Sequence, residues 1–341
     1  MTEQRPPILD GADPGAVEAF LRERDWLPDG ARVTAVARAG EGNMNLVLRV
    51  HWRTGAAAQG ADADADAGTL ILKQARPWVE KYPDIAAPPG RLAVEADFYR
   101  RTAMEPALAA RMPALLHVDE AACAACLEDL GSAADHLSLY ADATLSAADL
   151  DTLLAWLSRL HRLEVSADAW PRLRNADMRA LNHAHIFQIP FAADAPDADG
   201  FCPGLGAVAA TLRGDARLLA RLQALGEHYL ADGERLLHGD FYPGSWLACA
   251  DGPRIIDPEF AFLGAAEFDL GVLRAHLLFA GNEDPDLSAY VPPPGHDAAL
   301  ARAFAGAEVL RRLLGVAQLP LQADLPRRCA WIETARHWLR D

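Results

Sequence analysis

The stretch Leu236–Leu247, LLHGDFYPGSWL, is followed closely by Pro253–Phe260, PRIIDPEF. In both, apolar residues lead out of a short strand-like run into an irregular turn that carries acidic side chains. The first turn carries Asp240, and the second carries Asp257 and Glu259 at an i, i+2 spacing, which lets both carboxylates point to the same side of the chain. The two stretches predict a strand, a loop and a returning strand whose turns bring three carboxylates into one site.

These carboxylates suit phosphoryl transfer, which needs phosphates held, charge neutralised and the accepting hydroxyl oriented. Mg²⁺ takes hard oxygen ligands, commonly one or two carboxylates plus phosphate oxygens. Asp257 and Glu259 meet that demand, and Ser245 can add a hydroxyl. Asp240 can accept or orient the proton of a substrate hydroxyl, whereas His238 is expected to order the loop by hydrogen bonding. Taken alone, the first turn is also compatible with a structural β-turn that carries an aspartate.

A glycine-containing turn lies upstream, in Ala39–Val50, AGEGNMNLVLRV, between two strand-like runs. Its Gly42 lets backbone amides approach phosphates, and Asn43 or Asn45 can add side-chain donors. A GxG between strands is also typical of a tight turn without any ligand.

Lys73 interrupts the apolar run Thr69–Ala75, TLILKQA, and Glu95 lies in the middle of the next expected helix. A lysine there is either a snorkelling edge residue or a fixed cation that Glu95 holds toward the phosphates of ATP. An ordinary surface salt bridge would give the same pattern.

The chain changes character near residue 130. Before it we expect helices at 14–25 and 89–103, strands at 32–38, 44–52 and 69–74, and a strand pair within 113–130. After it long helical patterns dominate, the clearest being 146–164. This predicts an α+β protein with a sheet-rich lobe, residues 1–130, and a larger, mostly helical lobe, residues 131–341.

Composition excludes several classes of protein. About half of the 341 residues are apolar, which permits a large core, and the net charge of −16 disfavours a nucleic-acid partner. No apolar run is long enough to span a membrane and no signal peptide is visible, so we expect a cytoplasmic protein. The odd count of five cysteines indicates reduced thiols, and the lone CxxC of Cys123 and Cys126 lacks a second pair of metal ligands.

HGD followed by IDPE resembles the aminoglycoside phosphotransferase and choline kinase superfamily, relatives of the protein kinases, and within it the methylthioribose kinases. The similar segments include GEGNMNLVLRV, LILKQARPWVEKYP, LEDL and DPEFAFLGAAEFDLG, spread over nearly the whole chain. The resemblance implies a protein-kinase-like bilobal fold with ATP and Mg²⁺ in the cleft. It implies that Asn45 and Lys73 contact the phosphates, and that the hinge at adenine consists of Glu128, Asp129 and Leu130. It also implies that Asp240 is the catalytic base and that Asp257 and Glu259 bind the metal nucleotide. The sugar would be contacted by Arg311 or Arg312.

Two departures from the superfamily pattern bear on the acceptor. Ser245 stands where most of the superfamily has a metal-binding Asn, as it does in methylthioribose kinases. Tyr242 lies in Phe-Tyr-Pro where Leu-His-Thr is expected, which reshapes the acceptor pocket. Glu308 and Arg312 lie four apart on an expected helix, so Arg312 can equally form an ordinary ion pair.

The hypothesis from the sequence is therefore an ATP-dependent kinase of a small sugar, methylthioribose or a related 5-deoxypentose. Two alternatives stay open: a kinase of a cationic acceptor such as an aminoglycoside or choline, which the acidic charge suits, and a nucleotide-binding pseudokinase scaffold. The sequence also leaves a homodimer open.

Overall fold

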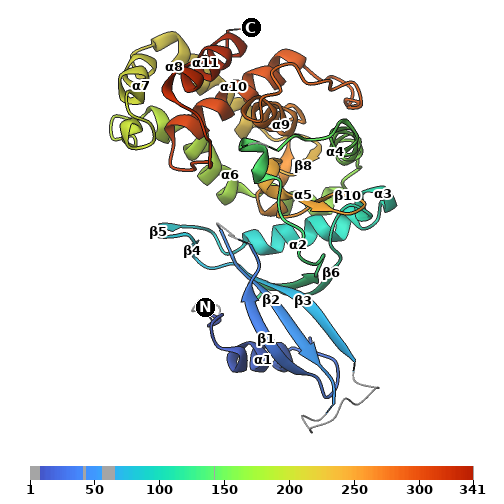
Figure 1. The fold of residues 1–341 in the computed structure, drawn as a ribbon. Helices are drawn as coiled ribbons and strands as arrows, with labels where there is room; N and C mark the ends of the chain where they lie inside the picture. Colours follow the sequence, from blue (N-terminus) through green and yellow to red (C-terminus); the bar gives the residue numbers. More distant parts are fainter. Residues whose placement is uncertain (1–7, 41–43, 56–65, 142, 341) are drawn as a thin grey trace. The chain divides into compact units, whose positions relative to one another are not determined.

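The computed structural model describes residues 8–40, 44–55, 66–141 and 143–340. It divides the chain into two compact units, Met1–Ala133 and Ala134–Asp341, which we call the N-terminal and C-terminal units. The division falls three residues beyond the boundary expected from the sequence, after residue 130. Figure 1 shows the elements of each unit in sequence colours.

A five-stranded antiparallel sheet with the order β1-β2-β3-β7-β6 forms the N-terminal unit. Its strands are β1 (Arg32–Arg38), β2 (Leu46–Arg53), β3 (Ala67–Gln74), β6 (Leu115–Asp119) and β7 (Ala124–Glu128). The strands expected at 32–38, 44–52 and 69–74 are therefore present, and the expected strand pair is β6 with β7. A hairpin that the sequence did not predict, β4 (Trp78–Val79) with β5 (Tyr82–Ala86), follows β3.

Helices cover both faces of this sheet. Ala124 and Cys126 of β7 pack in the cluster that contains α1 (Pro14–Glu23), whereas Ala125 packs with Leu92 of α2 (Arg91–Thr102). Since successive side chains of a strand point to opposite faces, α1 and α2 lie on opposite sides of the sheet. A short helix, α3 (Pro106–Ala109), follows α2.

The C-terminal unit is mostly helical, as expected. Its α-helices are α4 (Ala147–Leu160), α5 (Trp170–Leu173), α6 (Ala176–His183), α7 (Leu205–Arg213), α8 (Ala216–Leu230), α9 (Glu267–Phe279), α10 (Ala298–Leu314) and α11 (Leu325–Trp338). Short helical turns are η1 (Leu137–Tyr140), η2 (Ala167–Ala169), η3 (Ala184–Gln188), η4 (Ile189–Phe191), η5 (Ala198–Gly200), η6 (Pro243–Ser245) and η7 (Pro258–Phe260). Together with the sheet of the other unit they make the α+β, protein-kinase-like architecture.

Two small antiparallel strand pairs interrupt these helices. β8 (Arg235–Leu237) pairs with β11 (Phe262–Gly264), and β9 (Trp246–Cys249) pairs with β10 (Gly252–Ile255). They correspond to the strand, loop and return that the sequence predicts. The two acidic turns connect these pairs, because one leads from β8 to β9 and the other from β10 to β11.

The core of the C-terminal unit is built around α9 and α10. Nearly every residue of α9 is buried, which is typical of a helix enclosed on all sides. At Gly271 a Cβ atom would lie 2.8 Å from the carbonyl oxygen of Ala301 and 2.7 Å from Cβ of Phe304. Glycine therefore lets the backbones of α9 and α10 approach closely, and this contact fixes the side chains that the two helices share.

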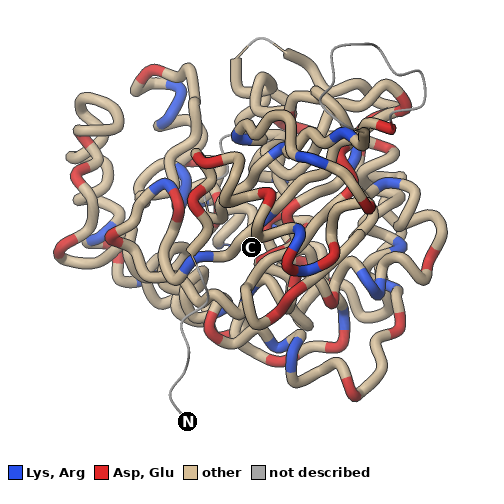
Figure 2. The backbone as a smooth tube through the Cα atoms, turned by 90° about the horizontal axis from the view of Figure 1, so that it is seen from below, with Lys and Arg blue, Asp and Glu red and all other residues tan. Residues whose placement is uncertain are grey.

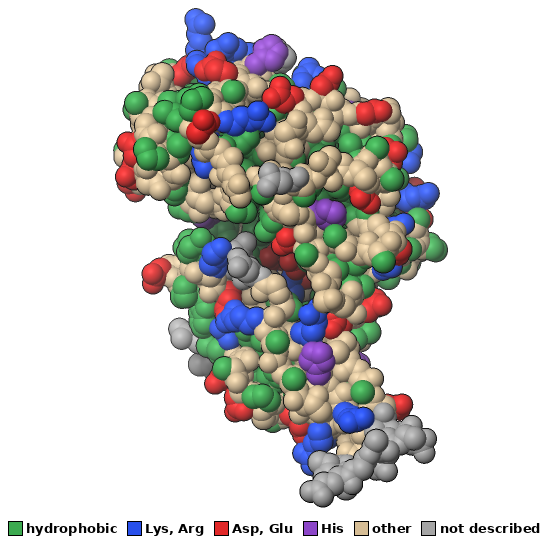
Figure 3. All heavy atoms as spheres, in the orientation of Figure 1, with side chains coloured by type: hydrophobic (Ala, Val, Ile, Leu, Met, Phe, Trp, Pro, Cys, Tyr) green, Lys and Arg blue, Asp and Glu red, His purple; other side chains and the backbone are tan. Residues whose placement is uncertain are grey.

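Acidic and basic residues are interspersed along the tube drawing of Figure 2 and over the face shown in Figure 3. None of the helices in the described part of the chain has the length and apolar character needed to cross a membrane.

Candidate active site

Asp240 lies in the turn that follows β8, directly after Gly239, whose φ of 84° is a left-handed value. A Cβ atom at Gly239 would lie 2.1 Å from the carbonyl oxygen of Phe260, so only glycine fits. Phe260 belongs to the second acidic turn. The first turn is thus pressed against the second immediately before its aspartate.

The carboxylate of Asp269 on α9 holds the backbone of the first turn by hydrogen bonds. Its Oδ2 accepts the backbone N–H of His238 at 2.7 Å, and its Oδ1 accepts that of Gly239 at 2.9 Å. The carboxylate is fully buried and also contacts Nε2 of His161 at 3.2 Å, while Nδ1 of that ring lies 2.8 Å from the Tyr290 hydroxyl. Two adjacent amides held by one carboxylate fix the direction of the turn. Asp269 lies in the segment FDLG, residues 268–271, and nothing in the sequence predicted that it supports this turn.

Hydrogen bonds tie the two acidic turns together. Ser245 donates its hydroxyl to the carbonyl of Asp240 at 3.0 Å, and its own carbonyl accepts the N–H of Ile256 at 3.0 Å. His238 donates from Nε2 to the carbonyl of Ile256 at 2.9 Å, which is the ordering role expected for this ring. Burial lowers the pKa of His238, so the ring is neutral and Nε2 carries its proton. Ile256 directly precedes Asp257, so these hydrogen bonds connect the two turns immediately before that aspartate. We call this connection, made by Ser245, His238 and Ile256, the joint of the two turns.

The second turn has its own support. Asp257 adopts a left-handed conformation with φ of 60°, a strained value for a residue other than glycine and typical of functional turns. Asn175, which precedes α6, donates its side-chain amide to the carbonyls of Glu259 and Ala261 at 3.1 and 2.9 Å. Glu259 is buried. Sequence reasoning missed Asn175, whose only signal was a polar residue before a helix.

An ion-pair cluster on α10 reaches Asp240. Arg312 donates from Nε to Oε1 of Glu308 at 2.6 Å and from Nη2 to Oδ1 of Asp240 at 3.1 Å, and it lies 4.8 Å above the ring of Tyr242. Arg311 donates to the other oxygen of Glu308 at 3.0 Å. The ion pair expected between Glu308 and Arg312 is therefore present, but Arg312 extends it to the predicted catalytic carboxylate.

Burial and charge set the protonation of this cluster. Burial raises the pKa of Glu308, but Arg311 and Arg312 outweigh that effect and hold it well below its usual range. Burial lowers the pKa of Arg312, but Glu308 and Asp240 outweigh it and raise that pKa. The carboxylate of Glu308 is thus ionised and the guanidinium of Arg312 is charged.

In the N-terminal unit, Lys73 of β3 pairs with Glu95 of α2. Nζ lies 2.7 Å from Oε1, and the two side chains are only 2% and 3% exposed. A surface salt bridge, the rival interpretation of this pair, is thereby excluded. A buried lysine held by a helix carboxylate has the form that nucleotide phosphate binding requires.

The glycine-containing turn is only partly described. Gly42 and Asn43 lie outside the described residues. Asn45 is buried, and its Oδ1 accepts Nε of Arg91 at 2.9 Å, while Nη2 of Arg91 reaches the carbonyl of Met44 at 2.8 Å. Arg91, which starts α2, was not anticipated from the sequence.

The expected hinge follows β7. Oε2 of Glu128 accepts the N–H of Ala114 at 3.0 Å. Asp129 accepts two hydrogen bonds from Arg49 at 2.8 and 3.0 Å. Burial raises the pKa of Asp129, but Arg49, the N–H of Gly131 and Thr69 together bring it below its ordinary value. These side chains shape the segment, and Leu130 continues it; adenine binding there stays a prediction.

The acidic turns fit a metal ion bound together with a nucleotide. Within the described residues no three His, Cys, Asp or Glu side chains gather into a complete metal site. A nucleotide-bound Mg²⁺ needs only one or two protein carboxylates, because phosphates and water fill the other positions. Asp257, Glu259 and Ser245 all lie in or beside the two connected turns and carry oxygen atoms of the kind such an ion takes, and metal binding by them stays a prediction.

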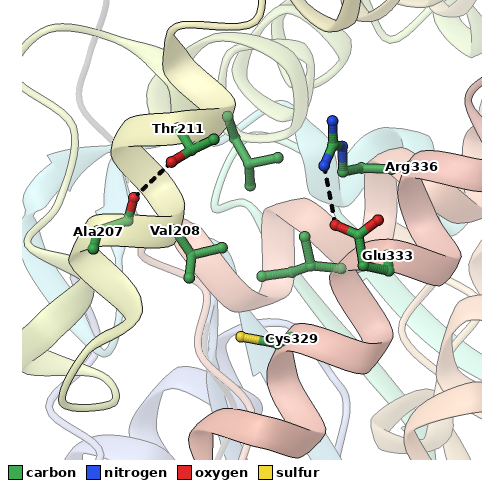
Figure 4. A pocket seen from close by; sticks show the side chains of 8 residues that line it. Ala207, Val208, Thr211, Cys329, Glu333 and Arg336 are labelled. Carbon is green, nitrogen blue, oxygen red and sulfur yellow. Dashed lines mark hydrogen bonds and ion pairs between the residues drawn. The ribbon is translucent and has the colours of Figure 1, made fainter.

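A surface pocket elsewhere in the C-terminal unit contains none of the predicted site residues (Figure 4). It lies between α7 and α11, where Val208 and Cys329 face each other from the two helices, and Arg336 pairs with Glu333 beside them. Nothing in its lining resembles the acidic turns.

Comparison with known proteins gives the following relatives. The chain is 29% identical over 265 residues to a methylthioribose kinase of Exiguobacterium sibiricum, covering 72% of this chain and 61% of that protein. It is 25% identical over 353 residues to a methylthioribose kinase of Geobacillus thermodenitrificans, covering 88% and 84%. The chain therefore spans about three fifths of the first relative and most of the second. No family model matches.

Among solved structures, the AMP-bound spectinomycin phosphotransferase APH(9)-Ia has the same fold. The TM-score is 0.53 at 12% identity, with 97% of this chain and 98% of that chain covered. At this identity the likeness concerns the fold alone.

Proposed function

We propose that the chain is a member of the aminoglycoside phosphotransferase and choline kinase superfamily, related to the methylthioribose kinases to which it is similar, and that it transfers the γ-phosphoryl group of ATP to a hydroxyl of a small sugar. The observation that carries the proposal is the joint of the two acidic turns, where Ser245 and Ile256 connect the chain around Asp240 to Asp257. Methylthioribose or a related 5-deoxypentose is the proposed acceptor.

Asp240 is the proposed catalytic carboxylate. Asp269 fixes the backbone of its turn, and Arg312 donates a hydrogen bond to its Oδ1. The carboxylate is therefore preorganised and needs little reorientation when an acceptor binds. It accepts or orients the proton of the acceptor hydroxyl as that oxygen attacks the γ-phosphorus and the bond to the ADP oxygen breaks.

Lys73 is proposed to contact the nucleotide phosphates, held in place by Glu95. Asp257 and Glu259 are proposed to hold Mg²⁺, with Ser245 nearby. When bound, the ion neutralises charge on the β- and γ-phosphates. The protein residues supply fixed oxygen ligands and a fixed cation, the main requirements of this reaction.

Tyr242 and Arg312 favour a neutral sugar over a cationic acceptor. Arg312 is buried, fully charged, stacked on Tyr242 and directed at Asp240. An ammonium group at this point would be repelled by the guanidinium. The net charge of −16, which suits a cation, acts over the whole molecule and is screened by salt.

The test is a coupled assay of ADP release with methylthioribose, 5-deoxyribose, ribose, choline and kanamycin as acceptors. We expect one of the sugars to give the highest kcat/KM. Turnover of choline or kanamycin alone would replace the sugar assignment. ATP binding without turnover of any acceptor would support a scaffold instead.

A further inference from the structure

A hydrogen-bonded chain runs through the core of the C-terminal unit and ends at Asp240. The Tyr140 hydroxyl, at the end of η1, forms a hydrogen bond with Nδ1 of His276 on α9. Nε2 of His276 lies 3.2 Å from Oε1 of Glu308 on α10. Glu308 holds Arg312, and Arg312 holds Asp240. Three elements far apart in the sequence are thus connected to one turn.

The protons of this chain have defined positions. Burial lowers the pKa of His276 to about 4, so the ring is neutral at pH 7. Burial raises the pKa of Tyr140 well above its ordinary value, so its hydroxyl keeps its proton. Because the ionised Glu308 can only accept, the neutral ring carries its proton on Nε2 and donates it to Glu308, and Nδ1 accepts from the Tyr140 hydroxyl.

Glu308 receives donors on both oxygens. Oε1 takes Nε of Arg312 and Nε2 of His276, while Oε2 takes Nη1 of Arg311. With three donors from two helices the carboxylate has little freedom to rotate. Its direction in turn fixes the plane of the Arg312 guanidinium, whose Nη2 points at Asp240.

We propose that Tyr140 and His276 are positioning residues of the phosphotransfer site, which hold Glu308 so that Arg312 keeps Asp240 in its reactive orientation. The inference rests on the proposed function. Such a buried polar chain is seldom needed for stability alone, because apolar side chains of similar volume often serve a core equally well. Its partly exposed end is Asp240, whose side chain is 19% exposed while that of Arg312 is 6% exposed.

The first test compares His276→Leu with His276→Gln. Leucine removes the donor to Glu308, whereas the glutamine amide can replace it. We expect His276→Leu to lower kcat about 10-fold to 100-fold with KM for ATP unchanged, since misplacement of a reacting group has effects of this size. His276→Gln should recover at least a third of the lost activity. Equal kcat for wild type and His276→Leu would overturn the proposal.

The matched control uses two buried tyrosines of the same unit. Tyr140→Phe removes the hydroxyl at the start of the chain. Tyr229→Phe removes one that accepts from Asn182 at 3.1 Å. We expect the first to lower kcat about threefold and the second to leave it unchanged, at comparable loss of thermal stability. Equal effects of the two on kcat would assign Tyr140 a purely structural role. This pair also decides the matter if His276→Leu does not fold.

A double-mutant cycle separates positioning from folding. If His276 acts through Arg312, then His276→Leu should lower kcat little further in an Arg312→Met background, because the chain is already broken. If the fold-reductions in kcat of the two single variants instead multiply in the double variant, the proposal is contradicted.

A measurement without turnover keeps the inference separate from the proposed function. NMR exchange of the Arg312 Nε–H, held 2.6 Å from Glu308, should be slow in the wild type and at least 10-fold faster in His276→Leu. If no acceptor is phosphorylated but this exchange accelerates, the proposed function fails and the positioning chain stands. Unchanged exchange would refute the chain whatever the activity.

Discussion

Lys73 Nζ lies 2.7 Å from Glu95 Oε1, and almost no water reaches either group. A buried ion pair of this kind is weak evidence for stability, because desolvation offsets much of the attraction. Removal of one partner, in contrast, leaves the charge of the other buried. Variants that remove one or both partners of this pair therefore distinguish its effect on stability from its effect on nucleotide binding.

Lys73→Met should destabilise the protein by about 3–5 kcal/mol, because Glu95 loses its cation inside the N-terminal unit. The double variant Lys73→Met, Glu95→Leu should regain most of that free energy of unfolding yet bind ATP weakly. Urea unfolding and calorimetric titration with ATP measure the two effects. Arg38→Met is the control and should change stability by less than about 1 kcal/mol, because Arg38 is exposed and its partner Glu80 still pairs with Arg76. Wild-type ATP affinity in the double variant would disprove the role of Lys73.

Asp240→Asn should lower kcat by about 10²–10⁴-fold, because an amide cannot take the proton of the acceptor. The dissociation constant for ATP should stay within about threefold of the wild type. ADP release and nucleotide titration on the same preparation test this. Turnover equal to that of the wild type would remove Asp240 from the mechanism.

Asp269→Asn should lower kcat about 10-fold and destabilise the protein by about 1–3 kcal/mol, because an amide has one acceptor oxygen for two backbone N–H groups. The control is Asp215→Asn at the start of α8, where the carboxylate also accepts two backbone N–H groups, those of Arg217 and Leu218. That variant should retain full kcat. A loss of stability without loss of kcat in Asp269→Asn would show that the turn does not depend on its anchor.

Asp257→Asn should raise the Mg²⁺ concentration needed for half-maximal rate by about 10-fold or more, since one of two protein carboxylates loses its charge. EDTA should abolish the activity, and added Mg²⁺ should restore it. Asp251→Asn, on the turn between β9 and β10, is the control and should leave the Mg²⁺ requirement unchanged. An unaltered Mg²⁺ titration in Asp257→Asn would move the metal away from this turn.

Stability should fall as pH falls from about 6.5 to about 4. Burial lowers the pKa of His276 from 6.5 to about 4, so in this window the unfolded chain binds a proton that the folded chain does not. The contribution is present above pH 6.5 and decreases toward pH 4, by about 3 kcal/mol at most. Urea unfolding at pH 7, 6 and 5 measures the slope, which should be smaller in His276→Gln. An equal slope in both proteins would show that another group titrates.

The sequence alone predicted much of the N-terminal unit. The alternation of Leu46, Leu48 and Val50 gave β2 because each of these side chains is buried on one face of the sheet. The hairpin of β4 and β5 was missed, because strands of two and five residues beside prolines carry no periodic signal.

The sequence alone determined the two acidic turns, because the residues on which they depend are near one another in the chain and follow short apolar strands. Only the tertiary structure decided that Asp269, Asn175, Tyr140 and His276 support these turns. Each is a polar residue within or beside an apolar helix, and nothing local specifies which helix faces which. That choice is made by the packing of α9 on α10 at Gly271 and of Gly239 on Phe260, where the space for a side chain is absent.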